Sequence, residues 1–145
     1  MICNVRLIPV LATFMIACGA EPTTPTPTIL RVVTDQGTYL AGGTGEVRIL
    51  NVSGGPVSYN ECERSLDRYD QGTWVAVSWR DSLAVNCVDI LRTLGVGAEI
   101  SVAFRLLDGL SAGTYRWRFD EIRMDDGGTP LPIWERVSTP FLVEP

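Results

Sequence analysis

Clusters of turn-forming residues interrupt the chain at short intervals from Ile29 onward, and they limit each apolar segment to the length of a β-strand. The clusters are AGGTG, NVSGGP, LGVG, DGLSAG and DDGGTP, and their glycine, proline, asparagine and aspartate residues favour tight turns. Between them apolar and polar residues alternate, and in GEVRILNV (Gly45–Val52) Val47 and Ile49 fall on one face. Alternation with a period of two is typical of strands, so the sequence predicts an all-β fold.

The number and spacing of these segments indicate how the strands are arranged. Short strands separated by turns, in a chain of 145 residues, predict an immunoglobulin-like antiparallel β-sandwich of seven to nine strands. An eight-stranded barrel is the alternative. We expect the strands within Thr28–Asp35, Gly45–Val52, Gly55–Cys62, Ser65–Asp70, Thr73–Trp79, Leu83–Leu91, Glu99–Leu107, Gly113–Met124 and Glu135–Val143.

The N-terminal segment predicts secretion. The apolar run from Leu7 to Ala17 is shorter than the roughly 20 residues that a membrane-spanning helix needs, and it follows a short region whose basic side chain is Arg6. This arrangement is typical of a signal peptide. Residues Glu21 to Thr28 then read EPTTPTPT, a composition that favours an extended, semi-rigid spacer.

The sequence Met15-Ile16-Ala17-Cys18 resembles the lipobox of bacterial lipoproteins, with Met15 where that family usually has leucine. The resemblance implies that residues 1–17 are a signal peptide and that Cys18 is lipid-modified and becomes the new N-terminus. Residues 18–28 would then be the lipidated cysteine and its tether, and residues 29–145 the sandwich domain. Gly19 stands where inner-membrane retention signals place aspartate, so the expected location is the extracytoplasmic cell envelope, and the outer membrane where the organism has one.

The charge balance argues against two classes of partner. The formal net charge is −5, and it becomes −6 without residues 1–17, whose charged side chain is Arg6. Nucleic acid attracts basic surfaces, so no nucleic acid partner is expected. Adhesion to anionic lipid by charge is also disfavoured, and membrane attachment is expected to depend on the acyl chains on Cys18.

The chain has four cysteines and no histidine. Cys3 leaves with the signal peptide and Cys18 carries the lipid, so Cys62 and Cys87 remain. Two cysteines in an oxidising compartment predict one disulfide, and two separate buried thiols are the alternative. A zinc site would need further ligands, so we expect no metal site.

Four stretches follow one another within residues 39–119: YLAGGTGEVRILNVSGGPVSYNEC, LDRYDQGTWVAV, LGVGAEISVAFRLL and LSAGTYRWRF. Together they resemble the bacterial immunoglobulin-like domains of secreted proteins and lipoproteins. The plan is also similar to that of the intracellular proteinase inhibitors of Gram-positive bacteria, with Gly95-Val96-Gly97 where that family has a proline-containing turn. These resemblances imply a β-sandwich, and they leave the chemistry open because one fold hosts many functions.

The residues give little support to catalysis. Without histidine the chain has no Ser-His-Asp or Cys-His arrangement. Glu61 and Glu63 flank Cys62 and would project from one strand face about 7 Å apart, a separation near that of paired carboxylates in glycoside hydrolases. A solvated acidic edge is the more ordinary interpretation, so we expect no enzyme and no cofactor.

Two further groups of residues have structural interpretations. Asp125 and Asp126 offer oxygen ligands for calcium, but a hairpin turn uses the same residue types. The alternation of aromatic with charged residues in YRWRFD predicts a row that faces the core, and Trp74 is out of phase with its apolar neighbours Val75 and Val77. The aromatic row comprises Tyr115, Trp117 and Phe119.

We therefore expect a membrane-anchored lipoprotein whose non-catalytic immunoglobulin-like domain acts by binding or structural presentation, with a protein or glycan ligand at the cell envelope. The alternative is an inhibitor of proteinases that acts through one exposed loop, either NVSGGPVSYN (51–60) or RMDDGGTPLPIW (123–134). A hydrolase would require a concave acidic cluster. The sequence does not predict the ligand or the oligomeric state.

Overall fold

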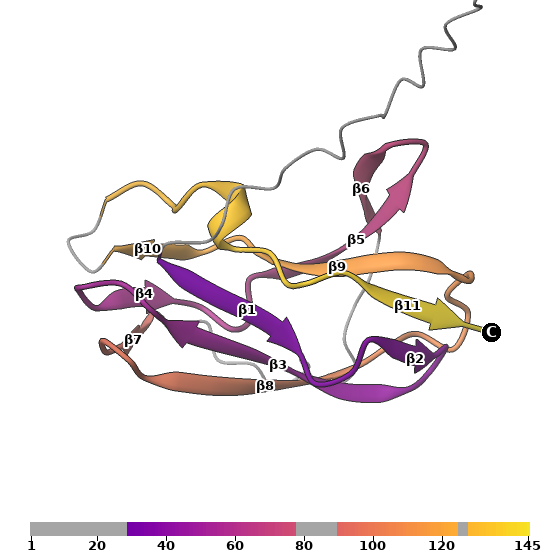
Figure 1. The fold of residues 1–145 in the computed structure, drawn as a ribbon, viewed down its shortest axis with the longest axis horizontal. Helices are drawn as coiled ribbons and strands as arrows, with labels where there is room; N and C mark the ends of the chain where they lie inside the picture. The colour runs from indigo at the N-terminus through magenta and orange to yellow at the C-terminus, as the bar shows by residue number, and fades with distance from the viewer. Residues whose placement is uncertain (1–28, 78–89, 125–127) are drawn as a thin grey trace, which may run out of the picture.

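A computed structural model describes residues 29–77, 90–124 and 128–145, which form an all-β domain (Figure 1). Within these residues no helix is long or apolar enough to cross a membrane, and the helical element is one 3-10 turn, η2 (Ile133–Glu135). The strands are β1 (Leu30–Thr34), β2 (Thr38–Leu40), β3 (Thr44–Asn51), β4 (Val57–Tyr59), β5 (Arg64–Asp70), β6 (Thr73–Val77), β7 (Arg92–Leu94), β8 (Glu99–Arg105), β9 (Gly113–Phe119), β10 (Ile122–Met124) and β11 (Phe141–Glu144).

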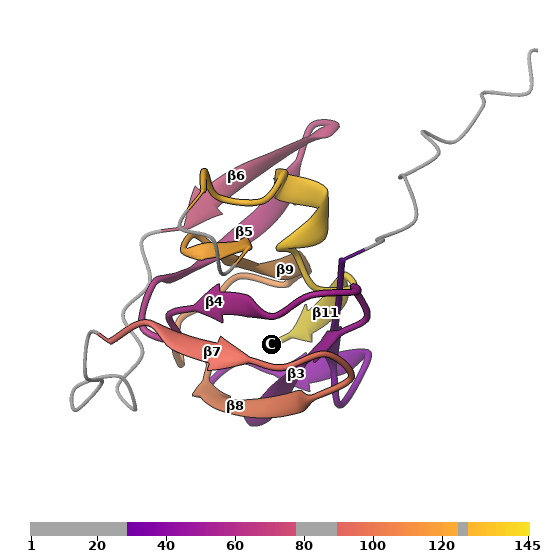
Figure 2. The same ribbon diagram turned by 90° about the vertical axis from the view of Figure 1, so that its left-hand side faces the viewer.

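The strands form two layers and a small end sheet. One layer has the order β1-β3-β8, and the other has the order β2-β11-β9-β5-β6. The third sheet, β10-β4-β7, lies at one end of the sandwich and stands at the front in Figure 2. Because the hydrogen-bonded sheets are separate, the domain is a sandwich and not a closed barrel.

Two features identify the sandwich as immunoglobulin-like. The first two strands belong to different layers, and β2 pairs in parallel with the last strand, β11, whereas the other strand pairs are antiparallel. Tyr115 on β9 donates its hydroxyl hydrogen bond back to the carbonyl oxygen of Ser111 at 2.8 Å, which is the tyrosine corner of this fold class. The predicted fold class is confirmed.

The core lies between the two layers and is built from alternate residues of their strands. Val47 and Ile49 on β3 are buried, as their shared face predicts. The ring of Trp117 lies 5.0 Å from that of Phe104, which joins the two layers through aromatic contact. The whole predicted aromatic row is buried, which confirms it as core: Tyr115, Trp117 and Phe119.

A buried carboxylate holds the start of β1. Glu135 on η2 is buried, and its Oε2 accepts hydrogen bonds from the backbone N–H groups of Ile29 at 2.9 Å and Leu30 at 3.2 Å. A buried carboxylate needs such donors. The start of β1 is therefore fixed by a residue that lies 105 positions later in the sequence.

The strand pattern differs from the prediction in its short elements. The described residues contain eleven strands, more than the seven to nine expected. Two of them, β2 and β7, have only three residues each, too few for a period of two to be visible in the sequence. Gly113–Met124 is divided into β9 and β10, and within Glu135–Val143 the strand begins only at Phe141, directly after Pro140. Of the strand expected at Leu83–Leu91, residues 83–89 lie outside the described residues, and Ile90 and Leu91 are not in a strand.

Candidate binding surface on the five-stranded sheet

The β5–β6 hairpin (Arg64–Val77) projects from the sandwich (Figure 1). Its two-residue turn is formed by Gln71 (φ 45°) and Gly72 (φ 87°), and positive φ at both central positions defines a type I′ turn. That turn matches the twist of the strands it joins. The hydroxyl of Thr73 donates a further hydrogen bond to the carbonyl oxygen of Asp70 at 3.1 Å, and this bond stabilises the turn.

Aromatic side chains occupy the outer face of this hairpin. Tyr69 and Trp74 are directly opposite each other in the ladder, and their ring centroids are 5.1 Å apart. The guanidinium of Arg116, on β9, lies 4.3 Å from the centroid of the Trp74 ring, a cation–π distance. Trp74 is half-buried as a result, while Tyr69 keeps 46% of its surface exposed.

A partly buried ion-pair cluster lies beside these rings, and we call it the Asp67 cluster (Asp67, Arg116, Arg118 and Asp120). Asp67 is fully buried. Its Oδ2 accepts hydrogen bonds from Nε and Nη2 of Arg116, both at 3.2 Å, and its Oδ1 accepts one from Nη1 of Arg118 at 2.9 Å. Nε of Arg118 also donates to Asp120 at 2.8 Å, and the Ser65 hydroxyl donates to the same carboxylate at 2.6 Å.

The strand register brings this cluster together. Asp67 on β5 is opposite Arg116 on β9, and Ser65 is opposite Arg118. Leu66 and Trp117, the neighbours of these residues, face the core. Because side chains alternate between the two faces of a sheet, the charged residues all lie on the outer face.

The electrostatics of the cluster suit structure and binding more than proton transfer. Burial lowers the pKa of the Arg116 guanidinium from its ordinary value, and the charge of Asp67 opposes that shift. The carboxylate of Asp67 uses both of its oxygens to bind two guanidinium groups. The arrangement therefore orients Arg116 against Trp74.

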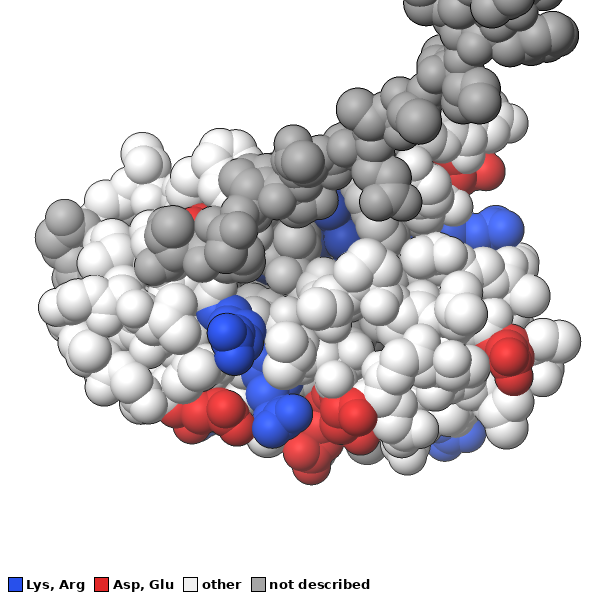
Figure 3. Space-filling view, viewed as in Figure 1, with Lys and Arg blue, Asp and Glu red and all other residues white. Residues whose placement is uncertain are grey.

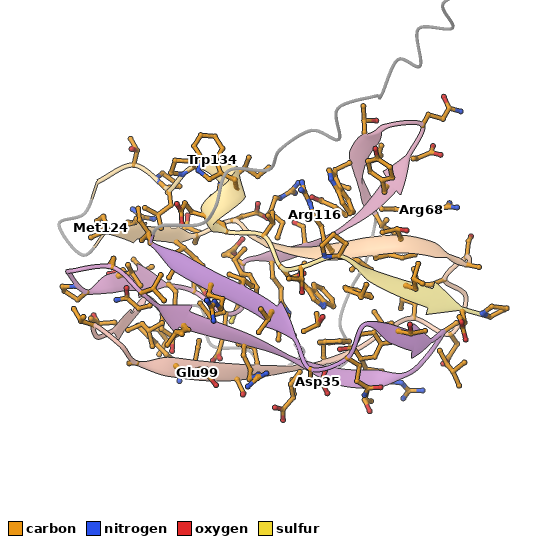
Figure 4. All side chains as sticks on the ribbon, in the orientation of Figure 1. Asp35, Arg68, Glu99, Arg116, Met124 and Trp134 are labelled. Atoms are coloured by element: carbon orange, nitrogen blue, oxygen red, sulfur yellow. The ribbon has the colours of Figure 1, made fainter. Side chains whose placement is uncertain are left out.

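The charged surface is mixed in sign elsewhere. On the side seen in Figure 3, acidic and basic side chains stand next to one another within a largely uncharged surface. Figure 4 places Arg116 and Trp134 on one side of the sandwich and Asp35 and Glu99 on the other. Arg116 of the Asp67 cluster lies over the ring of Trp74 on the hairpin, so the aromatic hairpin and the Asp67 cluster share one face of the domain.

The carboxylate pair considered for catalysis has the wrong geometry. Glu61 and Glu63 were expected on one face of a strand, but β4 ends at Tyr59 and β5 begins at Arg64, so both acids lie in the intervening turn. Glu61 forms an ion pair with Arg92 at 3.3 Å. The strand spacing on which the catalytic interpretation depended is therefore wrong.

Two surface hollows lined by described residues lack the concave acidic cluster that a hydrolase requires. One hollow of about 360 Å³ lies beside β2 and includes Glu144 as its acidic residue. Another of about 340 Å³ lies over β1 and β3 and includes Glu99. Each of these two hollows has a single acidic residue in its lining.

The loop at residues 51–60 is tied to the end sheet. Asn51 is buried, and its Nδ2 donates hydrogen bonds to the carbonyl oxygens of Gly55 at 2.8 Å and Leu94 at 3.0 Å. Its Oδ1 accepts a hydrogen bond from the backbone N–H of Ser53 at 3.0 Å. In the loop at 123–134, residues 125–127 lie outside the described part, and Trp134 is exposed on η2.

Several predicted residues lie outside the described part of the chain, namely Cys18, Cys87, Asp125 and Asp126. Cys62 is described, half-buried in the turn after β4, where its backbone N–H donates to Oδ1 of Asn60 at 3.0 Å. The Cys62–Cys87 disulfide and the lipidation of Cys18 therefore stay predictions. Residues 29–77, 90–124 and 128–145 contain no group of three or more acidic, cysteine or histidine residues that could hold a metal ion.

No protein-family model matches the chain, and no curated protein matches it. Among solved structures, it is similar to the alkylpurine DNA glycosylase AlkC of Pseudomonas fluorescens (11% identity, TM-score 0.40), covering 84% of this chain and 32% of that one. It is similar to the sporulation control protein Spo0M of Bacillus subtilis (15%, TM-score 0.44; 81% and 50% covered) and to a PapD-like domain of human CEP192 (13%, TM-score 0.35; 99% and 94% covered). The chain thus spans about a third and a half of the first two. At these values the likenesses say nothing about what this chain binds.

Sequence reasoning did not find the Asp67 cluster. The alternation in YRWRFD predicted that Arg116 and Arg118 point away from the core, and that prediction is correct. The missing part was Asp67, because its partners lie 49 and 51 residues away. The available signal was an acidic residue beside the core-facing Leu66 on a neighbouring strand.

Proposed function

We propose that the protein is a membrane-anchored, extracytoplasmic lipoprotein whose immunoglobulin-like domain binds a protein ligand without catalysing a reaction. The anchor is supported by the apolar run that ends at Cys18 and by the Pro/Thr-rich spacer after it. The first described strand, β1, begins at Leu30, shortly after the spacer, where Glu135 holds the backbone. A lipid, a spacer and a domain in this order present a surface at a distance from the membrane.

The projecting hairpin is the observation on which the binding role depends. Exposed aromatic residues beside arginine are enriched at protein interfaces, and Tyr69 with Arg116 provides this combination. A glycan usually stacks on an open aromatic face, but the ring of Trp74 is in contact with Arg116 and Tyr69. A protein ligand is therefore favoured over a glycan.

The anchor is tested by Cys18→Ala in the full chain expressed in a bacterial host. We expect the wild type to partition into the detergent phase and Cys18→Ala to accumulate with residues 1–17 attached, because the processing enzyme requires the modified cysteine. Cys3→Ala is the matched control, since it removes a cysteine within the signal peptide and should be processed normally. Normal cleavage and release of Cys18→Ala would contradict the anchor.

The binding surface is tested by placing a photo-crosslinking amino acid at Tyr69 in cells that express the full chain. Val96, which is 59% exposed in the turn between β7 and β8, is the control position. We expect a discrete crosslinked protein band from position 69 and not from position 96. Equal labelling at both positions, or none at position 69, would count against the hairpin as the binding surface.

A further inference from the structure

The outer edge of β6 offers unpaired backbone groups. In a two-residue hairpin, the residues that flank the turn, here Asp70 and Thr73, form a hydrogen-bonded pair. Hydrogen-bonded and non-hydrogen-bonded pairs then alternate along the ladder, so the N–H and C=O groups of Val75 and Val77 point toward β5. The corresponding groups of Trp74 and Ala76 point away from β5, toward the open edge.

Among the described residues, no backbone hydrogen bond reaches Trp74 or Ala76 from outside the β5–β6 hairpin. The strand TWVAV (73–77) also lacks the features that usually protect an edge. It has no charge and no proline, and its register with β5 runs without a bulge. Val75 leaves 50% of its apolar surface exposed beside this edge.

We propose that this edge pairs with the same edge of a second copy of the chain, through an antiparallel ladder whose twofold axis passes at Val75. In that register Trp74 of each copy exchanges both backbone hydrogen bonds with Ala76 of the other, so every outward group of these residues is paired. The five-stranded sheets of the two copies then form one continuous sheet.

The side chains of β6 suit this self-pairing. A twofold axis perpendicular to the sheet keeps each face on its own side, so the large ring of Trp74 lies opposite the small Ala76 of the second copy. Val75 lies opposite Val75 and covers its exposed surface. The strand carries no charge that would repel its own copy, and the hairpin projects from the sandwich (Figure 1), which leaves the edge clear of the described core.

A cysteine placed on the axis tests the register in the full chain, purified in detergent. Residues opposite each other as a non-hydrogen-bonded pair have Cα atoms about 4.5 Å apart, within the range of a disulfide. We expect Val75→Cys to give a reducible covalent dimer. Thr73→Cys is the matched control, because the two copies of residue 73 would lie about 14 Å apart along the ladder. Equal dimer from both variants, or none from Val75→Cys, would overturn the register.

A second pair of variants tests the edge without a new cysteine. Ala76→Pro removes an N–H group that points to solvent and spares the hydrogen bonds to β5, so it should stay folded, and Ala76→Thr keeps the N–H. By sedimentation, we expect the wild type and Ala76→Thr to be dimers and Ala76→Pro, with a wild-type melting temperature, to be a monomer. A monomeric wild type would overturn the proposal, even if its β6 edge pairs with a strand of another protein. A dimer that persists in Ala76→Pro would overturn it as well.

Discussion

Replacing Asp67 by asparagine should destabilise the domain far more than breaking one of its exposed ion pairs would. The side chain of Asp67 is 1% exposed, and those of Arg116 and Arg118 are 14% and 23% exposed. Asparagine keeps the size of the side chain and one acceptor oxygen, but it removes the charge that compensates two partly buried guanidinium groups. The substitution therefore isolates the electrostatic role of the carboxylate.

The magnitude follows from the cost of leaving a buried charge without its partner, about 3–5 kcal/mol. Because the two guanidinium groups keep some contact with water, we expect the lower end, about 3 kcal/mol. For a domain of this size, each kcal/mol lowers the melting temperature by about 4 °C, so Asp67→Asn should melt about 12 °C below the wild type.

Glu99→Gln is the matched control, since it removes one carboxylate from an exposed pair. Glu99 and Arg48 are 3.9 Å apart, and their side chains are 46% and 47% exposed. Such a pair contributes about 0.5 kcal/mol or less, and salt screens it. Urea unfolding at low and high salt measures both effects, and the loss for Asp67→Asn should persist at high salt. The reasoning is refuted if Asp67→Asn loses no more stability than Glu99→Gln.

Three further predictions concern other parts of the domain. Burial and a hydrogen bond to Asp35 raise the pKa of Tyr39 from 10.0 to about 12, so its stabilising contribution is complete below pH 10 and is lost as the pH rises toward 12. Melting curves between these values should therefore fall less steeply for Tyr39→Phe than for the wild type. A thiol count on unfolded, unreduced mature protein should find no free thiol from Cys62 or Cys87, and because the bridge would contribute roughly 3–4 kcal/mol, Cys62→Ser and Cys87→Ser should lower the melting temperature alike. Asn51→Ala should lower the free energy of unfolding by about 2 kcal/mol, since the carbonyl oxygens of Gly55, Leu94 and Gly95 lose their donor, and a urea midpoint equal to the wild type would contradict this.

The sequence predicted those parts of the fold that depend on local pattern. The period-two alternation around Val47 and Ile49 placed β3 and its buried face, because burial on one side of a sheet leaves this signature directly in the chain. The hairpin turn at Gln71-Gly72 falls between the expected strands Ser65–Asp70 and Thr73–Trp79, and glycine there readily adopts the positive φ that the turn requires.

The parts that were not predicted depend on pairing between distant segments. β2 shows no period-two pattern in the sequence, and it forms because its backbone pairs with that of β11. The Asp67 cluster needs the register of β5 on β9, and a one-residue slip would turn Asp67 toward the core. Glu135 appeared as the first residue of a strand, whereas its carboxylate serves the backbone of Ile29 and Leu30, a role that no local sequence pattern encodes.

The link between Glu135 and the start of β1 has a consequence for the order in which the fold can close. The donor at Ile29 and the acceptor at Glu135 are 106 residues apart, and β2 likewise pairs with β11. As the chain is synthesised, β1 can pair early with β3, but the contact with Glu135 and the pairing of β2 must wait until residues 135–144 have emerged. Because contacts between distant segments carry a loop-closure cost and slow folding, we expect the pairing of β2 with β11 to close the described domain late.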